Sequence, residues 1–419
     1  MAIFLYNLFL NFYKLGVKVT SIKSKKAQLW LDGRKDIFAK LKSWRSKLVP
    51  NEKIIWMHCA SLGEFEQGRP LIEEIKRTNP DYKIFLTFFS PSGYEVRKNY
   101  NQADAVFYLP MDGKANAQQF ISIIQPSIVL WVKYEYWFYY LTELKRKKIP
   151  VILVSAVFRE TQPFFKWYGA MWKQILHSFN KIFVQNVESV SLLQTIGFAQ
   201  NTVVTGDTRF DRVLDNAKNQ NSLPNVLLEF VKSSKVIIAG STWEEDEEEL
   251  VHYANTNKHI KFIIAPHEID DERIADVKKL FKNSVLFSQV GNTEITDQVV
   301  IIDNIGMLAS LYQLADVAYI GGGFNDSGIH NILEAAVFGK PIIFGPVYEK
   351  FAEATQLVDE GGAFSITNAL ELEQLIDSLL KDELLLTNTG AICKKYVQEN
   401  GGATKKIMEY LYEKRLLTS

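Results

Sequence analysis

Short apolar runs alternate with amphipathic helical stretches along most of the chain. In the first half, runs rich in β-branched and aromatic residues predict six strands, which helical periods such as 115–124 and 138–147 separate. The predicted strands are residues 54–57, 84–88, 105–109, 128–132, 151–155 and 182–185. Strands that alternate with helices form βαβ units, so this half predicts one doubly wound parallel sheet.

The alternation resumes after a stretch rich in Asn and Ser around Pro224, which predicts a linker. The second set of predicted strands is 236–239, 262–265, 299–302, 317–320 and 341–344, with helices at 244–254, 270–281, 331–338 and 349–359. We therefore expect an α/β fold with an N-terminal segment, a doubly wound domain, the linker, a second doubly wound domain and a C-terminal helix. The expected boundaries are 1–48, 49–212, 213–233, 234–400 and 401–419.

Two such domains would present the carboxyl ends of their strands to a shared cleft, where ligands bind. That arrangement suits a transferase with two substrates, and equally a two-domain epimerase or a hinge-type binding protein. A chain of 419 residues agrees with two domains. Cys59 and Cys393 imply no disulfide framework, and the six histidines show no paired ligand spacing. We therefore expect a cytosolic chain without a metal site.

The net charge of zero conceals a basic N-terminal segment. Residues 1–50 hold eleven Lys and Arg against two Asp, a charge of +9, and the rest of the chain holds 37 bases against 46 acids. Residues 1–13 are mostly aliphatic and aromatic, too few for the roughly 20 residues that span a bilayer. With the lysines that follow, they predict a helix lying on an anionic membrane surface through residues 1–26. The alternative is a terminal helix packed on the body with solvated lysines; a nucleic-acid partner is not expected, because the body is acidic.

The clearest chemical motif follows the predicted strand 317–320. Glycines allow a backbone to approach a ligand closely, and a helix predicted to begin near His330 would offer free N–H groups to a phosphate. Its candidate nucleotide-binding residues are Gly322, Gly323, Gly328, His330, Asn331 and Glu334, which follow Gly321. The spacing favours nucleotide binding over an ordinary glycine turn with a capped helix. In contrast, the acidic run 244–249 predicts the solvated first turns of a helix after a Ser-Thr cap.

A second motif, residues 58–70, directly follows the first predicted strand. Glu64 lies at the end of that strand, where a carboxylate could take a proton from an attacking hydroxyl. Ser61 and Glu64 also have the spacing of a capping box, and the residues alone leave both interpretations open.

Together these stretches resemble the 3-deoxy-D-manno-octulosonic acid (Kdo) transferases of lipid A assembly. The resemblance runs from about residue 50 to about residue 400. The motifs that carry it are 60–64 (ASLGE), 108–112 (YLPMD), 206–211 (GDTRFD), 240–243 (GSTW), 265–268 (APHE), 322–334 and 345–346 (GP).

The resemblance implies a GT-B fold, CMP-Kdo as donor substrate with no cofactor, and a lipid A precursor as acceptor. It implies an inverting transfer at the cytoplasmic face of the inner membrane, with Glu64 as the general base. On the donor side it implies Ser241, Thr242 and His267 in addition to the glycine-rich motif. On the acceptor or phosphate side the candidates are Ser61, Gly63, Arg69, Glu135 and Arg209, although Arg209 could instead form an ion pair with Asp207 or Asp211.

This chain departs from the family pattern at 132–137, 155–159 and 266–268, where it reads VKYEYW, SAVFR and PHE. The last change removes an arginine near the expected nucleotide, and His267 could assume part of its role.

CMP carries one phosphate, so helix N-termini and a few cations could replace a metal. The sequence also allows two other functions, namely a nucleotide-sugar epimerase and a non-catalytic membrane-associated nucleotide-sugar binding protein.

Overall fold

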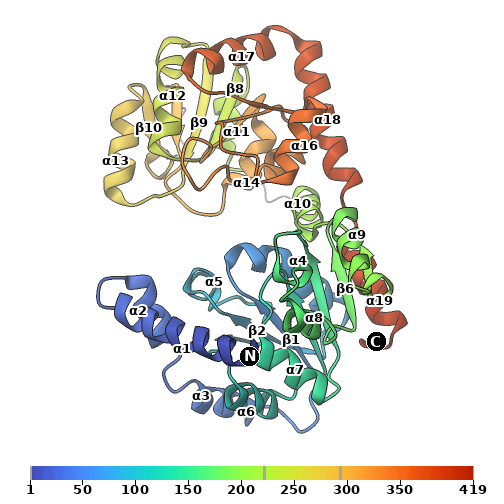
Figure 1. Ribbon diagram of the computed structural model, residues 1–419. Helices are drawn as coiled ribbons and strands as arrows, with labels where there is room; N and C mark the ends of the chain where they lie inside the picture. The colour runs from blue at the N-terminus through green and yellow to red at the C-terminus, as the bar shows by residue number, and fades with distance from the viewer. Residues whose placement is uncertain (1, 220–222, 292–294, 419) are drawn as a thin grey trace. The chain divides into compact units, whose positions relative to one another are not determined.

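The computed structural model describes residues 2–219, 223–291 and 295–418, which form two compact units (Figure 1). Unit 1 comprises Met1–Arg212 and Gly401–Ser419, and unit 2 comprises Val213–Asn400. Each unit contains one seven-stranded sheet whose described strands all pair in parallel. The prediction of two doubly wound parallel sheets is confirmed.

Unit 1 contains a sheet in the order β3-β2-β1-β4-β5-β6-β7. Its strands are β1 (Ile54–Cys59), β2 (Lys83–Phe88), β3 (Ala105–Tyr108), β4 (Ile128–Val132), β5 (Val151–Ala156), β6 (Lys181–Val184) and β7 (Thr202–Val204). Its helices are α1 (Ala2–Thr20), α2 (Lys25–Asp32), α3 (Ile37–Arg45), α4 (Leu62–Thr78), α5 (Pro91–Arg97), α6 (Lys114–Ile124), α7 (Phe138–Arg146), η1 (Pro163–Phe165), α8 (Ala170–Leu176), α9 (Val187–Thr195), η2 (Ala199–Asn201) and α19 (Ala403–Glu413). The winding direction reverses between β1 and β4, and ligands of such folds bind outside the strand ends at that switch point.

The sheet of unit 1 is buried on both faces, as parallel sheets are. One apolar cluster joins it to α1, α3, α6, α7 and α8, and another joins its opposite face to α4 and α19. In the second cluster Gly68 of α4 lets the helix approach the strands closely, because a Cβ there would lie 3.1 Å from the Cys59 sulfur.

Unit 2 contains a sheet in the order β10-β11-β9-β8-β12-β13-β14, with its switch point between β8 and β12. Its strands are β8 (Lys235–Thr242), β9 (Ile260–Pro266), β10 (Ser284–Leu286), β11 (Val299–Ile301), β12 (Val317–Ile320), β13 (Ile342–Phe344) and β14 (Ala363–Ser365). Its helices are α11 (Asn225–Val231), α12 (Glu244–Thr256), α13 (Asp271–Leu280), η3 (Phe287–Gln289), α14 (Leu308–Leu311), η4 (Tyr312–Leu314), α15 (Leu333–Ala336), α16 (Ala352–Glu360), α17 (Ala369–Lys381) and α18 (Glu383–Glu399).

The structure differs from the sequence expectations mainly at short elements and at the ends of units. Strands β7, β10 and β14 were not predicted, because they are three-residue strands at sheet edges and are only partly buried, so they lack the fully buried apolar run of β11 and β13. Helix α10 (Thr208–Lys218) runs into the segment expected to be a linker, whose residues 220–222 lie outside the described residues. Helix α19 packs Ile407 and Leu411 into the core of unit 1.

Candidate functional site

Glu64 lies on the first turn of α4, immediately after β1 and at the switch point of unit 1. Its side chain is only 8% exposed, and its carboxylate accepts a hydrogen bond from the backbone N–H of Ala60. Ser61 is the N-cap of α4, but its side chain makes no cap hydrogen bond. The reciprocal capping box that the spacing allowed is therefore absent, and Glu64 has a different partner.

The surroundings of Glu64 raise its pKa from 4.5 to about 7. Burial is the main cause, because it disfavours the charged form, and the negative charge of Glu135 adds to it. The Ala60 and Tyr134 N–H groups and the Lys133 ammonium oppose this rise. A carboxyl group that titrates near neutral pH suits proton transfer in either direction at that pH.

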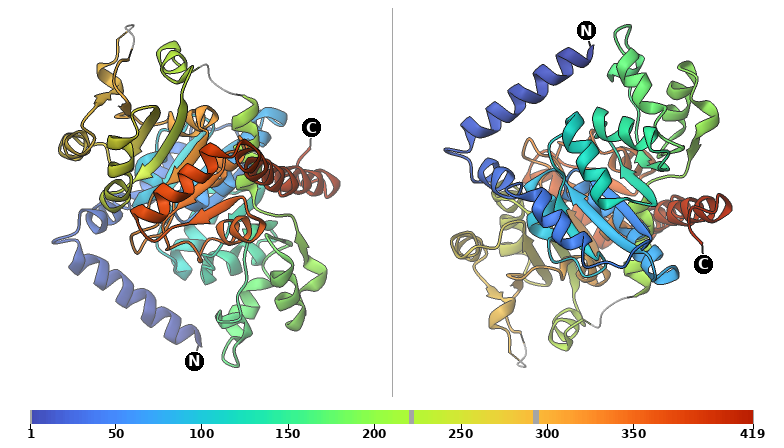
Figure 2. Two further views of the ribbon diagram at one scale, coloured as in Figure 1. Left: turned by 90° about the horizontal axis from the view of Figure 1, so that it is seen from above. Right: turned by 90° about the horizontal axis from the view of Figure 1, so that it is seen from below.

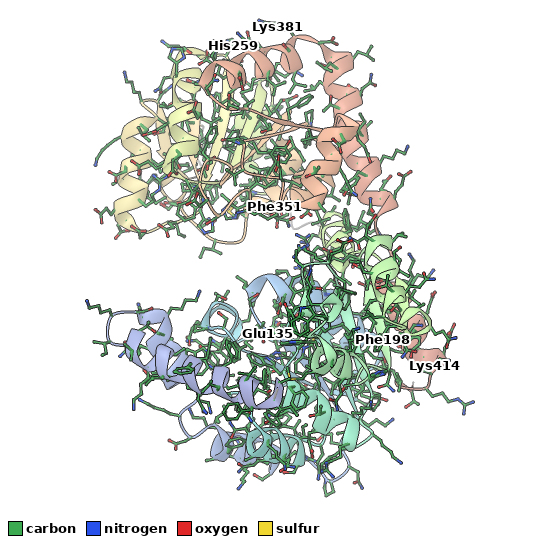
Figure 3. The ribbon with its side chains drawn as sticks, in the orientation of Figure 1. Glu135, Phe198, His259, Phe351, Lys381 and Lys414 are labelled. Atoms are coloured by element: carbon green, nitrogen blue, oxygen red, sulfur yellow. The ribbon has the colours of Figure 1, made fainter. Side chains whose placement is uncertain are left out.

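Glu135 follows β4, the strand on the other side of the same switch point (Figure 3). Its Oε2 accepts a hydrogen bond from the Trp137 indole at 2.7 Å and lies 3.3 Å from Nε2 of His58. The topology of the sheet thus brings together two carboxylates that are 71 positions apart in the sequence. The candidate residues Glu64 and Glu135 therefore belong to one cluster.

His58 was not among the sequence candidates, although it is the buried side chain that contacts Glu135. Its Nδ1 lies 2.9 Å from the Thr87 hydroxyl, which accepts the Trp56 indole proton at 2.8 Å. The Thr87 hydroxyl donates to the carbonyl of Met57 at 3.5 Å. The imidazole of His58 is thus held between Thr87 of β2 and Glu135, which follows β4.

The other acceptor-side candidates differ in whether other groups of the protein already contact them. Gly63 faces open space, since a Cβ added there would have no atom within 4 Å. Arg69 pairs with Glu73 at 2.8 Å, on the same helix. Arg209 pairs with Asp207, with 2.8 Å between Nε and Oδ2, which is one of the two ion pairs expected as the alternative to phosphate binding.

In unit 2, the glycine-rich segment after β12 lies directly against neighbouring loops. A Cβ on Gly321 would lie 2.2 Å from the Ser241 carbonyl oxygen, and one on Gly323 would lie 2.5 Å from the backbone nitrogen of Gly345. Gly322 has a φ of +91° and Gly328 a φ of +80°, values that favour glycine. The glycines thus allow three loops to pack closely against one another at the β8–β12 switch point.

The acidic run at the start of α12 is not a uniformly solvated helix turn, and that part of the sequence expectation is wrong. Asp246 is fully buried and accepts hydrogen bonds from the backbone N–H groups of Gly322 at 2.7 Å and Trp243 at 2.9 Å, and from the Tyr319 hydroxyl at 2.9 Å. Asp246 therefore ties the glycine-rich loop to the start of α12.

Glu247, the next residue of the run, is also fully buried. It accepts a hydrogen bond from the Thr242 hydroxyl at 2.7 Å and pairs with Arg273 at 2.7 Å. The donor-side candidate Thr242 is therefore buried with its hydroxyl directed at Glu247, while Ser241 adopts a left-handed backbone with a φ of +54°.

Three rings form a stack beside the glycine-rich loop. Trp243 stacks on His267 with centroids 4.7 Å apart, and His267 stacks on His330 at 4.4 Å. The Trp243 indole donates to Nε2 of His330 at 3.2 Å. Burial lowers the pKa of His330 to about 4, and the neighbouring His267 adds to this. At neutral pH His330 is therefore uncharged, with its proton on Nδ1.

The helix expected at 331–338 is present but shorter, because it begins at Leu333 and ends at Ala336. The preceding residues stay outside the helix because the N–H of His330 bonds to the Gly321 carbonyl at 3.0 Å. The side chain of Asn331 accepts a hydrogen bond from the Leu333 N–H at 3.3 Å, and its amide donates to Glu334 at 3.1 Å. A helix of one turn has a weaker dipole than the longer helix we expected. A phosphate at this position would therefore depend more on side-chain contacts.

Each unit is a doubly wound sheet with polar residues at its switch point, and two such units are the architecture of the GT-B fold, which glycosyltransferases and nucleotide-sugar epimerases share. The fold is similar to UDP-GlcNAc 2-epimerase from Neisseria meningitidis, solved with UDP-GlcNAc, at a TM-score of 0.60 and 18% identity over 86% of this chain and 100% of that chain. It is also similar to MurG from Acinetobacter baumannii, at a TM-score of 0.54 and 14% identity over 86% and 99% of the two chains. At these identities the likeness establishes the fold alone.

Residues 35–212 match the model of a family described as 3-deoxy-D-manno-octulosonic-acid transferase (kdotransferase). A 3-deoxy-D-manno-octulosonic acid transferase from Aquifex aeolicus is 27% identical over 78% of this chain and 86% of the relative. One from Rickettsia prowazekii is 26% identical over 96% of this chain and 88% of the relative. The resemblance to Kdo transferases that the motifs indicated is confirmed over most of the chain.

None of the helices in the described ranges has the combination of length and hydropathy that crossing a bilayer requires. Likewise, the described residues include no cluster of three or more His, Cys, Asp or Glu side chains arranged to hold a metal ion.

Proposed function

We propose that this protein is an inverting, metal-independent glycosyltransferase that moves Kdo from CMP-Kdo onto a lipid A precursor. The observation that carries the proposal is the buried carboxyl of Glu64, with a pKa of about 7, at the β1–β4 switch point of a chain similar to Kdo transferases. A nucleotide-sugar epimerase shares the fold, but that likeness gives no support to its activity.

In the proposed reaction Glu64 accepts the proton of an acceptor hydroxyl as the hydroxyl oxygen attacks the anomeric carbon of Kdo. The new carbon–oxygen bond forms as the bond to the CMP phosphate breaks, and the bonding electrons leave with the phosphate. A single displacement inverts the anomeric centre. CMP leaves with one phosphate, so hydrogen-bond donors and a few cations could stabilise it without a metal.

The donor is assigned to the loops of unit 2 that Asp246 holds together. A nucleotide can be bound by flat aromatic surfaces and by N–H donors. Trp243, His267 and His330 provide a stack of rings, and the Nδ1–H of His330 provides a donor. Glu334 and Asn331 lie beside them as polar candidates for ribose hydroxyls. Trp243 and Asp246 thus join the candidates read from the sequence.

The test is CMP release by the full chain supplied with CMP-Kdo and a tetra-acylated lipid A precursor in the presence of EDTA. We expect release that depends on the lipid, together with a lipid product whose mass has increased by whole Kdo units. Binding of CMP-Kdo without release of CMP would contradict the transferase assignment. CMP release that occurs without EDTA but is lost when EDTA is added would contradict metal independence.

We further propose that the protein binds the cytoplasmic face of the inner membrane through α1, which lies at the edge of unit 1 (Figure 2). One face of α1 packs Tyr6 and Leu10 into the core, and the Tyr6 hydroxyl donates to Asp112 at 2.6 Å. The opposite face is an apolar stripe of exposed residues: Phe4, Leu8, Phe12, Leu15 and Val19. An exposed apolar stripe flanked by lysines suits insertion among anionic lipid headgroups.

Replacing Phe4, Leu8 and Phe12 together with serine is expected to weaken sedimentation with phosphatidylglycerol vesicles by at least about tenfold, because three apolar side chains no longer leave water. Deleting the whole helix would be less informative, since it would also remove Tyr6 and Leu10 from the core. A matched control replaces three exposed apolar residues elsewhere, Val187, Leu370 and Leu384, with serine. Equal loss of sedimentation in both variants would contradict the assignment to α1.

A further inference from the structure

A cavity of about 580 Å³ opens in unit 1. It lies between α1, α2 and α3 and the segment that follows β3, and we call it the α1–α3 pocket. Its volume is within the range of pockets that bind small molecules. None of the candidate catalytic or donor-binding residues lines it.

The walls of the α1–α3 pocket are largely hydrophobic. Trp30 and Leu31 contribute from α2, Ile37 and Phe38 from α3, and Met111 from the segment after β3. A surface of this kind offers few hydrogen bonds to a sugar or a nucleotide, but it can remove a hydrocarbon chain from water. The walls therefore favour an acyl chain as ligand.

The same pocket carries an excess of positive charge. Lys14 and Lys18, one turn apart on α1, line it together with Arg34, against the single acid Asp36. Three cations and one carboxylate leave the lining with a net charge of +2. A pocket that combines hydrocarbon walls with cations matches a ligand that has both an acyl chain and an anionic group.

Arg34 shows that the positive charge is built into the fold. Its guanidinium lies 3.8 Å from the centre of the Trp30 ring and donates to the carbonyls of Trp30, Phe89 and Leu109 at 3.0, 2.7 and 2.9 Å. Burial lowers its pKa to about 9, so it remains a cation at neutral pH. Within the described part of the chain no carboxylate forms an ion pair with Arg34. Its close partners are the three carbonyl oxygens and the Trp30 ring, and the negative charge of Glu135 acts on it from further away.

We propose that the α1–α3 pocket binds one acyl chain of the phosphorylated acceptor lipid, with a phosphate of that lipid at Lys14 and Lys18. The inference rests on the proposed function, because it takes the acceptor to be such a lipid. Lys14 and Lys18 lie on α1 between its packed face and its apolar stripe, so a lipid in the membrane meets the pocket at the same helix. The pocket then holds the acceptor by its lipid part while its sugar remains available for the reaction.

The first measurement is titration calorimetry of the full chain with dodecyl phosphate, which carries one chain and one phosphate, and no donor sugar. We expect dodecyl phosphate to bind at least about tenfold more tightly than either inorganic phosphate or dodecyl maltoside, each of which lacks one of the two features. Equal binding of dodecyl phosphate and dodecyl maltoside, or no binding of dodecyl phosphate, would overturn the proposal.

Two variants assign the binding to this pocket. The double variant Lys14→Glu, Lys18→Glu should weaken dodecyl phosphate binding by at least about tenfold, because repulsion replaces attraction at two positions. The matched control Lys23→Glu, Lys25→Glu makes the same charge change nearby on exposed residues that do not line the pocket, and it should have little effect. Ala39→Trp should fill the pocket without changing its charge; if binding survives in that variant, the pocket is not the site.

Competition separates the acceptor from bulk membrane lipid. A tetra-acylated lipid A precursor should displace dodecyl phosphate at concentrations at least about tenfold lower than short-chain phosphatidylglycerol does. Equal displacement would overturn the acceptor assignment. The proposed function is judged separately, because CMP release without dodecyl phosphate binding would reject only the pocket, and binding without CMP release would reject only the reaction.

Discussion

The Glu64→Gln variant is expected to transfer Kdo about 10²- to 10⁴-fold more slowly than the natural chain, with CMP-Kdo binding little changed. Glutamine preserves the size of the side chain but cannot accept the proton of the attacking hydroxyl. Because Glu64 lies in unit 1 and the donor candidates lie in unit 2, the effect should fall on turnover rather than on donor affinity. Lipid-dependent CMP release and calorimetry with CMP-Kdo measure the two quantities.

Glu74→Gln is the matched control, since Glu74 is on the same helix and pairs with Arg77. Full activity in Glu64→Gln would exclude Glu64 as the base. Equal losses in both variants would point instead to a general disturbance of α4.

The pH profile tests the same assignment through Glu135. The base acts when deprotonated, so kcat/KM should rise with pH and level off above the pKa of Glu64, which is about 7. Glu135→Gln removes a negative charge that raises this pKa, so the rising limb should move to lower pH. An unshifted limb would mean that another group controls the profile. His58 holds Glu135 in place, and it should therefore influence the reaction without touching the substrate.

Asp246→Ala is expected to cause the largest loss of stability, about 3–5 kcal/mol of the free energy of unfolding of unit 2. The substitution leaves two backbone N–H groups and the Tyr319 hydroxyl buried without their acceptor. It also releases the Gly322 loop, so CMP-Kdo affinity should fall as well. Urea denaturation, analysed with a separate transition for each unit, measures the change.

Two further variants test the reason for that loss. Asp246→Asn should recover much of the stability, because its carbonyl oxygen can accept from both backbone N–H groups and its amide can donate to the Tyr319 hydroxyl. Glu248→Ala removes an exposed carboxylate from the same helix, and its effect should stay within about 0.5 kcal/mol. Similar losses for Asp246→Ala and Glu248→Ala would show that the buried hydrogen bonds contribute little.

Local patterns were sufficient for the long elements of the fold. Strands such as Ile128–Val132 and Val317–Ile320 are runs of buried residues between turns, and their alternation with helices implies parallel pairing. The motif around Glu64 was also readable, because it directly follows such a strand. The three-residue edge strands and the shortened helix α15 were not readable, since contacts with distant segments override weak local preferences there.

The sequence by itself determined the two doubly wound sheets, the resemblance to Kdo transferases and the carboxylate at the end of the first strand, because each is written in residues close together along the chain. Only the tertiary structure brought His58 to Glu135, buried Asp246 against the Gly322 loop, and left Arg34 as a cation beside an apolar pocket. Burial and charge depend on which distant segments exclude water from a side chain. The six-residue acidic run 244–249 therefore gave no local sign that two of its carboxylates are in the core.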